Sequence, residues 1–432
     1  MEMGDSQRVS RTARRALLPV LALAAALAAG TAAGQPQPAC DPDDAGLRLA
    51  EGFCAVLVGE ELGPVRQLAV AGNGDVFAAL RGEPGGVLAL RDGDGDGRAE
   101  VRRRFGSGSG HGIRLHEGFL WFAADERVVR WPWRSGQLEP EGDPQTIVSF
   151  PPQDSHERKA IALGPDGALH ASVGAPSNAC QREARTARSP GLDPCPQLER
   201  HAGIWRFAAD RPDQTLADGE RVATGMRHTL AMAIHPGTGV LWGAINGRDQ
   251  LGSLWGFSDE ANARLPAEEL VRVTKGSDFG WPYCYYDGLA GRKVLAPEYG
   301  GDGEEVGRCA DTDDPALAFP AHWAPMDLAF APADAFGGGF GNDAFVSFHG
   351  SWNRAPLPQE GYRVVHVPFE GGAPAGAFET FAIGAASPTA VRFTGLAFGP
   401  RGTLYAAADE NGRIWRILRE PKRAAPAAAA EP

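Results

Sequence analysis

One unit recurs six times along the chain: an apolar strand, a turn containing Gly, and a second strand that ends in small residues. A clear copy is KAIALGPDGALHASV from Lys159, in which GPDG forms the turn. Apolar residues alternate with a period of two and the turns are rich in Gly and Asp, which excludes a helical solenoid. The copies begin at Gln67, Gly112, Lys159, Leu230, Met326 and Thr394.

This repeat predicts an all-β fold, a six-bladed β-propeller of four-stranded antiparallel blades. Several copies are followed by a basic-aromatic strand, such as GIWRFA or RIWRIL. The unequal spacing predicts long loop insertions on one face, over residues 177–201 and 246–320, where loops of this length build a binding face. We expect the strand over residues 49–58 to close the ring against the last blade.

Both ends of the chain differ from the repeats. A basic segment containing Arg14 and Arg15 precedes an apolar run over residues 16–29, which is too short to span a bilayer. We interpret residues 1–34 as a signal peptide, 35–422 as the propeller and 423–432 as a disordered Ala/Pro-rich tail. A periplasmic or secreted protein without a membrane span follows. The formal net charge of -12 argues against a nucleic-acid partner.

The six cysteines all lie beyond the signal peptide, and an even count in an exported chain favours disulfides. Sequential pairing is the leading prediction, although six cysteines allow fifteen connectivities, which remain open. There is no CxxC and no CxxCH, so a zinc-thiolate site and a covalently attached haem are disfavoured. The sequential pairs are Cys40/Cys54, Cys180/Cys195 and Cys284/Cys309.

Polar residues stand at equivalent points near the first strand of four repeats: His111, His156, Arg227–His228 and His322. Radial symmetry would gather them at one end of the propeller axis. There a neutral His156 imidazole can accept a proton from a substrate hydroxyl, although a surface histidine in a charged loop is the alternative. Arg227 can bind an anionic or quinone oxygen, or form an ordinary salt bridge. Arg354 and Arg392 are expected at the same end and suit carboxylates.

Two further patterns suggest ligands. Asp92, Asp94 and Asp96 alternate as in a calcium loop, but Arg103 stands where an EF-hand has an acid, so a solvated acidic turn is the alternative. Separately, three tryptophans offer flat walls for a planar cofactor or a sugar, or else pack at blade edges. They are Trp281, Trp323 and Trp352.

The ordered motifs resemble the soluble pyrroloquinoline quinone (PQQ)-dependent glucose/sorbosone dehydrogenase family from about Leu47 to Leu418. His156 precedes LGPDGALHASVG, and the later motifs are GMRHTLAMAIHPGTGVLWGAI, GSDFGWPYC, HWAP, FHGSWNR and RFTGLAFGPRGTLYAAADENGRIWRI. GWPYC and HGSWNR make the chain most similar to the sorbosone-dehydrogenase-like branch.

The resemblance implies an exported quinoprotein that uses PQQ and calcium to oxidise an aldose or a related aldehyde or alcohol by hydride transfer. His156 matches the family's general base, and Arg227 matches the arginine that stabilises the reduced quinone. Backbone carbonyls of Gly247 and Arg248 match the calcium-holding turn. The cofactor-binding set implied around them is His111, Arg227, His228, His322, Arg354 and Arg392.

Some positions depart from that family's pattern. His228 stands where the family often has asparagine, and Ala390 stands where a second basic residue is expected. Electrons would pass to a separate acceptor, a cytochrome or a quinone, because no haem motif is present. A calcium-dependent propeller lactonase and a non-catalytic ligand-binding propeller are the alternative functions.

Overall fold

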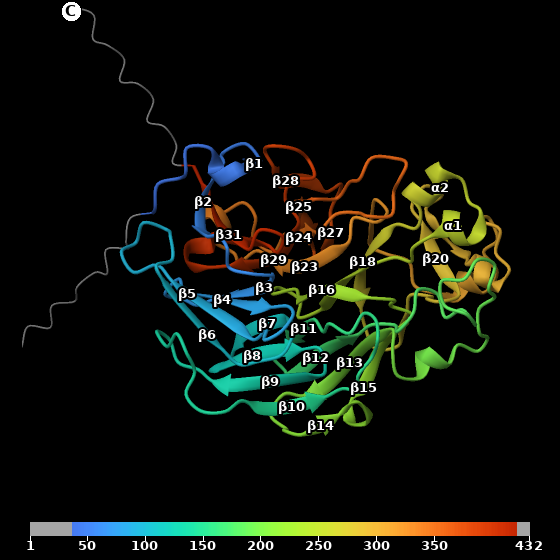
Figure 1. The fold of residues 1–432 in the computed structure, drawn as a ribbon, viewed down its shortest axis with the longest axis horizontal. Coiled ribbons are helices and arrows are strands. Elements are labelled where there is room, and N and C mark those ends of the chain that lie inside the picture. Colours follow the sequence, from blue (N-terminus) through green and yellow to red (C-terminus); the bar gives the residue numbers. More distant parts are fainter. Residues whose placement is uncertain (1–36, 421–432) are drawn as a thin grey trace, which may run out of the picture. The chain divides into compact units, whose positions relative to one another are not determined.

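The computed structural model describes residues 37–420, which form six antiparallel sheets whose innermost strands contact one another in a closed ring (Figure 1). The predicted six-bladed β-propeller is therefore confirmed. The predicted signal peptide and the predicted tail both lie outside the described residues. No helix among the described residues is long and apolar enough to cross a membrane.

Each blade is built from strands that follow one another along the chain, numbered here from the innermost outward. Blade 1 has β3 (Val65–Val70), β4 (Val76–Leu80), β5 (Val87–Arg91) and β6 (Val101–Phe105). Blade 2 has β7 (Gly110–His116), β8 (Phe119–Ala124), β9 (Arg127–Pro132) and β10 (Gln145–Ser149). Blade 3 has β11 (Ile161–Leu163), β12 (Ala168–Val173), β13 (Gly203–Ala208) and β15 (Glu220–Thr224).

The other three blades complete the ring. Blade 4 has β16 (Thr229–Ile234), β17 (Leu241–Ile245), β18 (Glu268–Val273) and β22 (Leu317–Phe319). Blade 5 has β23 (Pro325–Phe330), β24 (Ala344–Phe348), β25 (Arg363–Val367) and β28 (Glu379–Gly384). Blade 6 has β29 (Phe393–Phe398), β30 (Leu404–Ala408), β31 (Arg413–Arg419) and β2 (Phe53–Gly59).

The ring closes as expected, because the outermost strand of blade 6 comes from the N-terminal part of the chain. β2 pairs antiparallel with β31, with Phe53 opposite Arg419. Three more strands extend sheets at their edges: β1 (Leu47–Leu49) on blade 5, β14 (Gln214–Thr215) on blade 2 and β19 (Ser277–Asp278) on blade 3. Closure ties the two ends of the propeller together and leaves no open gap between the first and last blades.

The strands are buried along most of their length because each blade packs between two others. β24, with the sequence AFVSF, is buried at every residue, and its Phe345 packs with Phe381 and Phe398 of blades 5 and 6. Such continuous apolar runs are typical of strands covered on both faces. The hydrophobic core therefore lies between the blades, and the polar chemistry is left to the strand ends.

The insertions lie on blades 3 and 4. Residues 174–202 join β12 to β13, and residues 246–267 join β17 to β18 and carry α1 (Leu251–Trp255) and α2 (Asp259–Arg264). A third segment, 274–316, carries the hairpin of β20 (Cys284–Asp287) and β21 (Arg292–Leu295). A small hairpin on blade 5 pairs β26 (Phe369–Glu370) with β27 (Ala373–Pro374).

The expectation of one insertion over residues 246–320 is wrong, because β18 divides it. The strand EELVRV opens with two acidic residues shortly after Pro266, a pattern that is not typical of a buried strand. In the structure Glu268 and Glu269 are buried, and β18 pairs with β17 and β22 as the third strand of blade 4. Two separate insertions therefore cover this blade.

The three disulfides join sequential cysteines, which confirms the leading prediction. The Cα atoms of the pairs Cys40–Cys54, Cys180–Cys195 and Cys284–Cys309 are 5.8, 6.2 and 5.7 Å apart. The first attaches the segment before β1 to blade 6. The other two each close a loop within an insertion, where little regular structure is present to hold the chain.

Candidate active site

The innermost strands share a local irregularity where they begin, at the end of the ring that we call the entry edge. In five blades the pairing with the next strand skips there, so that extra residues bulge from the inner strand. A β-bulge re-aims a side chain out of the regular alternation. The bulged residues include Arg66, His111, Leu230 and Met326.

Arg66 joins four blades across the axis. Its Nη1 forms a salt bridge of 2.8 Å with Asp409 Oδ2, its Nε donates to His111 Nδ1 at 3.3 Å, and its Nη2 lies 3.8 Å from the Met326 sulfur. The other carboxylate oxygen of Asp409 binds His349 Nε2 at 3.0 Å. These contacts form a continuous charged chain beneath the entry edge.

This chain fixes the protonation of its histidines. A guanidinium nitrogen can only donate, so the Nδ1 of His111 accepts a hydrogen bond from Arg66. The proton of the His111 ring is therefore on Nε2, which donates to the Leu230 carbonyl at 3.2 Å. Burial, with the Arg66 charge, holds the pKa of His111 well below its usual range. Because His111 is fully buried, a contribution of this residue to binding a cofactor would pass through Arg66.

Arg392 stands above the same chain. Its Nη1 donates to the His349 carbonyl at 3.2 Å and lies 3.4 Å from His349 Nδ1, and its Nη2 donates to Tyr362 Oη at 3.2 Å. A cavity of ≈130 Å³ opens beside Arg392, and Ala390 and Glu410 help to line it. The guanidinium is partly exposed, and its Nε lies 3.5 Å from the exposed Glu410 carboxylate, so a carboxylate-bearing ligand that enters this cavity would replace Glu410 as its partner.

His156 lies on the other side of the entry edge, in the loop before β11. Its backbone has a positive φ of 52°, and its Nδ1 donates to the Ala175 carbonyl at 2.6 Å. The proton is therefore on Nδ1, and Nε2 keeps its lone pair, with no hydrogen bond to that atom among the described residues. A neutral imidazole with a free Nε2 is the form that a general base requires.

The loop reaches this position through close backbone contacts. A Cβ on Gly174 would lie 2.6 Å from both the Cβ and the carbonyl oxygen of His156, so only glycine allows the approach. Gln153 Nε2 donates to the Ser155, His156 and Gly174 carbonyls at 2.7, 3.0 and 3.2 Å. One amide thus holds both sides of the contact.

Electrostatics keep His156 neutral. Burial, followed by the positive charge of Arg227, lowers its pKa to about 3, while the Ala175 bond and the Asp249 carboxylate act in the opposite direction. The His228 ring packs against it with centroids 4.5 Å apart and a tilt of 31°. The His228 Nε2 is buried without a hydrogen-bond partner among the described residues. An unsatisfied buried polar atom at a site of this kind indicates a missing ligand or water.

Arg227 is held by four acceptors. Its Nε and Nη2 donate to the backbone and side-chain oxygens of Asn178 at 3.2 and 3.1 Å, its Nη1 to the Gly247 carbonyl at 2.8 Å, and its Nη2 to Asp249 at 2.9 Å. A guanidinium has five N–H donors, so one Nη1 hydrogen remains for another partner. Trp281 Nε1 also donates to the Asn178 carbonyl at 2.9 Å.

The predicted calcium turn adjoins this clamp. Gly247 donates its N–H to Glu268 Oε2 at 2.7 Å, and its carbonyl receives Arg227. The Arg248 side chain forms a buried ion pair with Glu298. One lone pair of the Gly247 carbonyl therefore faces a guanidinium, and a cation at this turn has to use the second lone pair. Burial raises the pKa of Glu268 to about 7.

Two predicted cofactor residues turn instead to the protein backbone. His322 Nε2 donates to the Asn262 carbonyl at 2.8 Å, and Arg354 donates to the Ala263 and Pro358 carbonyls at 2.6 and 2.9 Å. Both side chains are buried, and both fasten α2 and its flanking residues to blade 5. Arg354 and Arg392 therefore donate to different acceptors in the structure.

The acidic loop between β5 and β6 stands apart from the entry-edge residues in its contacts. Asp92, Asp94 and Asp96 approach one another, and Glu100, which sequence reasoning passed over, joins them, with one oxygen of each within 4.8 Å of the others. Asp92 also accepts the N–H groups of Gly95 and Gly97, at 2.7 and 2.9 Å. Calcium in this loop stays a prediction.

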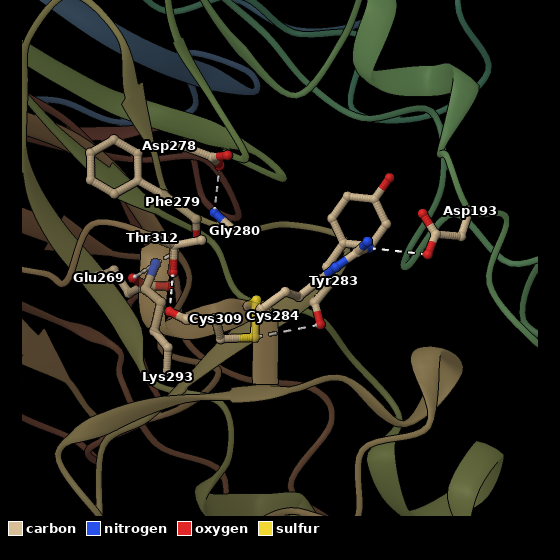
Figure 2. The surroundings of a disulfide bond; sticks show 11 residues. Asp193, Glu269, Asp278, Phe279, Gly280, Tyr283, Cys284, Lys293, Cys309 and Thr312 are labelled. Atoms are coloured by element: carbon tan, nitrogen blue, oxygen red, sulfur yellow. Dashed lines mark hydrogen bonds and ion pairs between the residues drawn. A yellow bond between two sulfur atoms is a disulfide. The ribbon is translucent and has the colours of Figure 1, made fainter. Parts of the chain in front are cut away.

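Figure 2 shows the surroundings of the Cys284–Cys309 disulfide. Next to it, Lys293 pairs with Glu269 at 3.2 Å in a buried ion pair and also donates to the Phe279 carbonyl. Phe279 and Trp281 follow β19, and the Trp281 N–H binds the Gly225 carbonyl at 3.1 Å. The insertion thereby presses against the segment that carries Arg227.

Sequence reasoning missed Arg66, Asn178, Asp249 and Asp409, and it assigned no role to His349, which contacts Asp409 and Arg392. Arg66 had a usable signal, because it occupies in its repeat nearly the place that His111 occupies in the next. Asp409 ends the second strand of its blade, as His349 does in the blade before. These two residues thus share a second equivalent point of the repeats.

Known proteins were compared with the chain. The model of a family described as TrAA12-like matches residues 47–420. A PQQ-dependent pyranose dehydrogenase of Coprinopsis cinerea is 34% identical over 119 residues, which cover 24% of this chain and 15% of that protein. A PQQ-dependent sugar dehydrogenase of Hypocrea jecorina is 25% identical over 167 residues, 34% of this chain and 36% of that protein. The matched segments thus span well under half of these relatives.

Solved structures are similar over nearly the whole chain. A Trichoderma reesei carbohydrate-active enzyme of family AA12 superposes with a TM-score of 0.73 at 20% identity, covering 87% of this chain and 98% of that one. The holo PQQ domain of the Coprinopsis cinerea pyranose dehydrogenase gives 0.72 at 19% identity, covering 90% and 99%. At such identities the likeness shows the shared propeller fold.

Proposed function

The chain belongs to the TrAA12-like family, and from this premise we propose that it is a PQQ-dependent dehydrogenase of sugars. The names of its relatives support the substrate class, and the pair of His156 and Arg227 supports the chemistry. One observation carries the proposal: a neutral imidazole with a free Nε2 stands beside a fixed guanidinium that has one donor to spare. An aldose or a related aldehyde or alcohol is the expected substrate.

The residues present fit PQQ, which carries carboxylates and a quinone. Arg392 faces a cavity, Arg227 keeps one N–H for a quinone oxygen, and His228 Nε2 is buried without a partner. Cationic forks are suited to carboxylates, and a buried ring nitrogen gains a hydrogen bond when a polar ligand covers it. The further set of His111, His322 and Arg354 would support this binding from beneath and beside it.

In the proposed reaction, His156 Nε2 takes the proton of the sugar hydroxyl. Bound PQQ supplies the acceptor for the hydride. The imidazolium that forms on His156 is stabilised by the Ala175 carbonyl and by the Asp249 carboxylate, both of which favour its protonated form. Arg227 stays in place throughout, because Asn178 and Asp249 hold its guanidinium.

Calcium at the Gly247–Arg248 turn is part of the proposal. Backbone carbonyl oxygens are hard ligands that suit this ion, and the second lone pair of the Gly247 carbonyl is available to it. Asp249 and Glu268 carry further oxygens close by in the chain and in the fold. Removing calcium with a chelator should lower PQQ affinity, and restoring calcium should recover it.

Export and a separate electron acceptor complete the proposal. The basic, apolar and small-residue pattern of residues 1–34 supports export to the periplasm or the medium. The three disulfides agree with an oxidising compartment. The acceptor, a cytochrome or a quinone, would be a different molecule.

The test is reconstitution. Purified protein lacking PQQ is mixed with PQQ, with and without calcium, and dye reduction is measured against a panel of aldoses and their lactones. Reduction that requires PQQ and an aldose supports the proposal. Lactone hydrolysis without PQQ would support the propeller lactonase, and PQQ binding without reduction of any dye would support a binding protein.

A further inference from the structure

The three tryptophans suggested as flat walls have different environments. Trp281 and Trp323 are buried, at 6% and 4% exposed, and they pack within the protein. Trp352 is 62% exposed, and the only other large hydrophobic side chain exposed to this degree among the described residues is Leu289, at 61%. A single exposed apolar side chain is common on a protein surface, and Trp352 is distinguished by how firmly its loop is held.

The residue before Trp352 is held tightly. Ser351 is 1% exposed, its N–H donates to the Glu360 carbonyl at 2.8 Å and its hydroxyl donates to Gln359 Oε1 at 2.7 Å. Its carbonyl accepts the Tyr362 hydroxyl at 2.7 Å. The loop between β24 and β25 is therefore closed on itself at this point.

The residues after Trp352 are held as firmly, by the α2 insertion. The Asn353 carbonyl accepts Asn262 Nδ2 at 2.9 Å, and Arg354 donates to the Ala263 carbonyl at 2.6 Å. With both neighbours fixed, the exposed indole is displayed from a rigid backbone, and little conformational entropy is lost when a ligand covers it.

This display is connected to the candidate active site. The Tyr362 hydroxyl that binds Ser351 also accepts Arg392 Nη2 at 3.2 Å, and Arg392 donates to the His349 carbonyl three residues before Trp352. The Arg392 guanidinium lies 4.6 Å from the centre of the Tyr362 ring. Trp352 and Arg392 thus share one support.

We propose that Trp352 is a binding platform on which a pyranose ring of the sugar substrate stacks, a role that rests on the proposed function. Indole combines a flat apolar face with one N–H donor, which matches the C–H face and hydroxyl rim of a pyranose. A protein partner would also contact the exposed Ala355, Pro356 and Pro358 of this loop, and unchanged sugar affinity in Trp352→Ala would favour that partner over the sugar.

The experiment measures sugar binding by calorimetry in protein without PQQ and in PQQ-loaded protein, with glucose and maltose as probes. Trp352→Ala is expected to weaken sugar binding about tenfold, and Trp352→Phe less than threefold, since stacking needs only an aromatic face. Leu289→Ala is the matched control, because it removes an equally exposed apolar side chain and should leave binding unchanged. All variants should melt within about 2 °C of the wild type.

Three outcomes would overturn the platform. The first is unchanged sugar affinity in Trp352→Ala. The second is a loss of PQQ affinity alone in that variant, which would assign the indole to the cofactor. The third is a wild-type protein that binds neither sugar, with or without PQQ. Sugar binding that depends on Trp352 in a protein that reduces no dye would refute the proposed dehydrogenase while leaving the platform in place.

Discussion

The two halves of the entry edge are built on different principles. On blades 3 and 4, under the insertions, His156 and His228 are neutral rings with nitrogen atoms left without protein partners. On blades 5, 6, 1 and 2, the His349 and His111 nitrogens all contact an arginine, a carboxylate or a carbonyl. The first half is equipped to move a proton, whereas the second holds charge in a fixed place.

This difference also explains where the insertions are. A charged chain such as Asp409–Arg66–His111 holds itself together through its own ion pair and hydrogen bonds. On the His156 side, Arg227 shares the Asp249 carboxylate with Arg185, and its partners come from the insertions: Asn178 from residues 174–202 and Asp249 from residues 246–267. The Cys180–Cys195 disulfide stabilises the segment that supplies Asn178.

The largest expected effect is on kcat, and it distinguishes the two halves of the entry edge. His156→Gln should lower kcat for dye reduction about 10³-fold, because the proton acceptor is lost, and should leave PQQ affinity within about threefold. His349→Gln should instead weaken PQQ binding while lowering kcat less than tenfold at saturating PQQ. Equal losses of kcat in the two variants would show that the halves do not divide the work in this way.

The next effect is on stability. Asp409→Asn leaves the buried Arg66 without its counter-ion and should lower the free energy of unfolding by about 3 kcal/mol in urea titrations. Asp249→Asn should cost less, because Asp249 is more exposed and its partner Arg227 keeps three other acceptors. If Asp249→Asn proved the more destabilising variant, the charged half would not be the more tightly stabilised one.

A smaller effect tests the position of His156 without touching its ring. Gly174→Ala places a methyl group 2.6 Å from His156 atoms, so the loop must shift, and kcat should fall about tenfold to a hundredfold. Gly72→Ala is the control, since its Cβ would meet nothing within 4 Å. Equal turnover in Gly174→Ala and Gly72→Ala would mean that the loop geometry is unimportant.

The smallest effect is a change in pH dependence. The folded pKa of His156 is about 3, below the usual value of 6.5, so the unfolded chain binds more protons and stability falls as pH drops from 6.5 toward 3. Asp409, with its pKa lowered to about 2, contributes stability above pH 4 that is lost as pH falls toward 2.

Urea titrations at several pH values check both signs. His156→Gln should flatten the slope of unfolding free energy between pH 6.5 and 3, and Asp409→Asn should flatten it only below about pH 4. A wild-type slope of the opposite sign over the upper range would contradict a neutral buried His156.

Most features of the fold and the site that the sequence could predict came from the positions of residues within the repeats. The six turn-containing copies were sufficient for the propeller, and equivalent points in the copies brought forward His156, Arg227 and His228, which do meet. His322 was selected by the same logic and Arg354 was expected at the same end, yet both bind backbone carbonyls of the α2 region. The sequence does not predict such partners, because they depend on the conformation of an insertion.

The residues that sequence reasoning missed were missed because no repeat position indicates where they lie in the fold. Asn178 and Asp249 lie in insertions without a repeat, so nothing in the sequence placed them near Arg227. Arg66 and Asp409 are 343 residues apart and meet because the ring closes. A β-bulge turns Arg66 and His111 toward the axis, which strict alternation of strand residues does not predict.

The most direct test of the central claim is the rate at which sugar reduces bound PQQ in a single turnover, followed by absorbance in a stopped-flow instrument. Wild-type protein and His156→Gln would be compared at saturating PQQ, so that differences in cofactor affinity do not enter. The account predicts a rate about 10³-fold lower in the variant with the same amplitude. Equal rates would show that His156 is not the base.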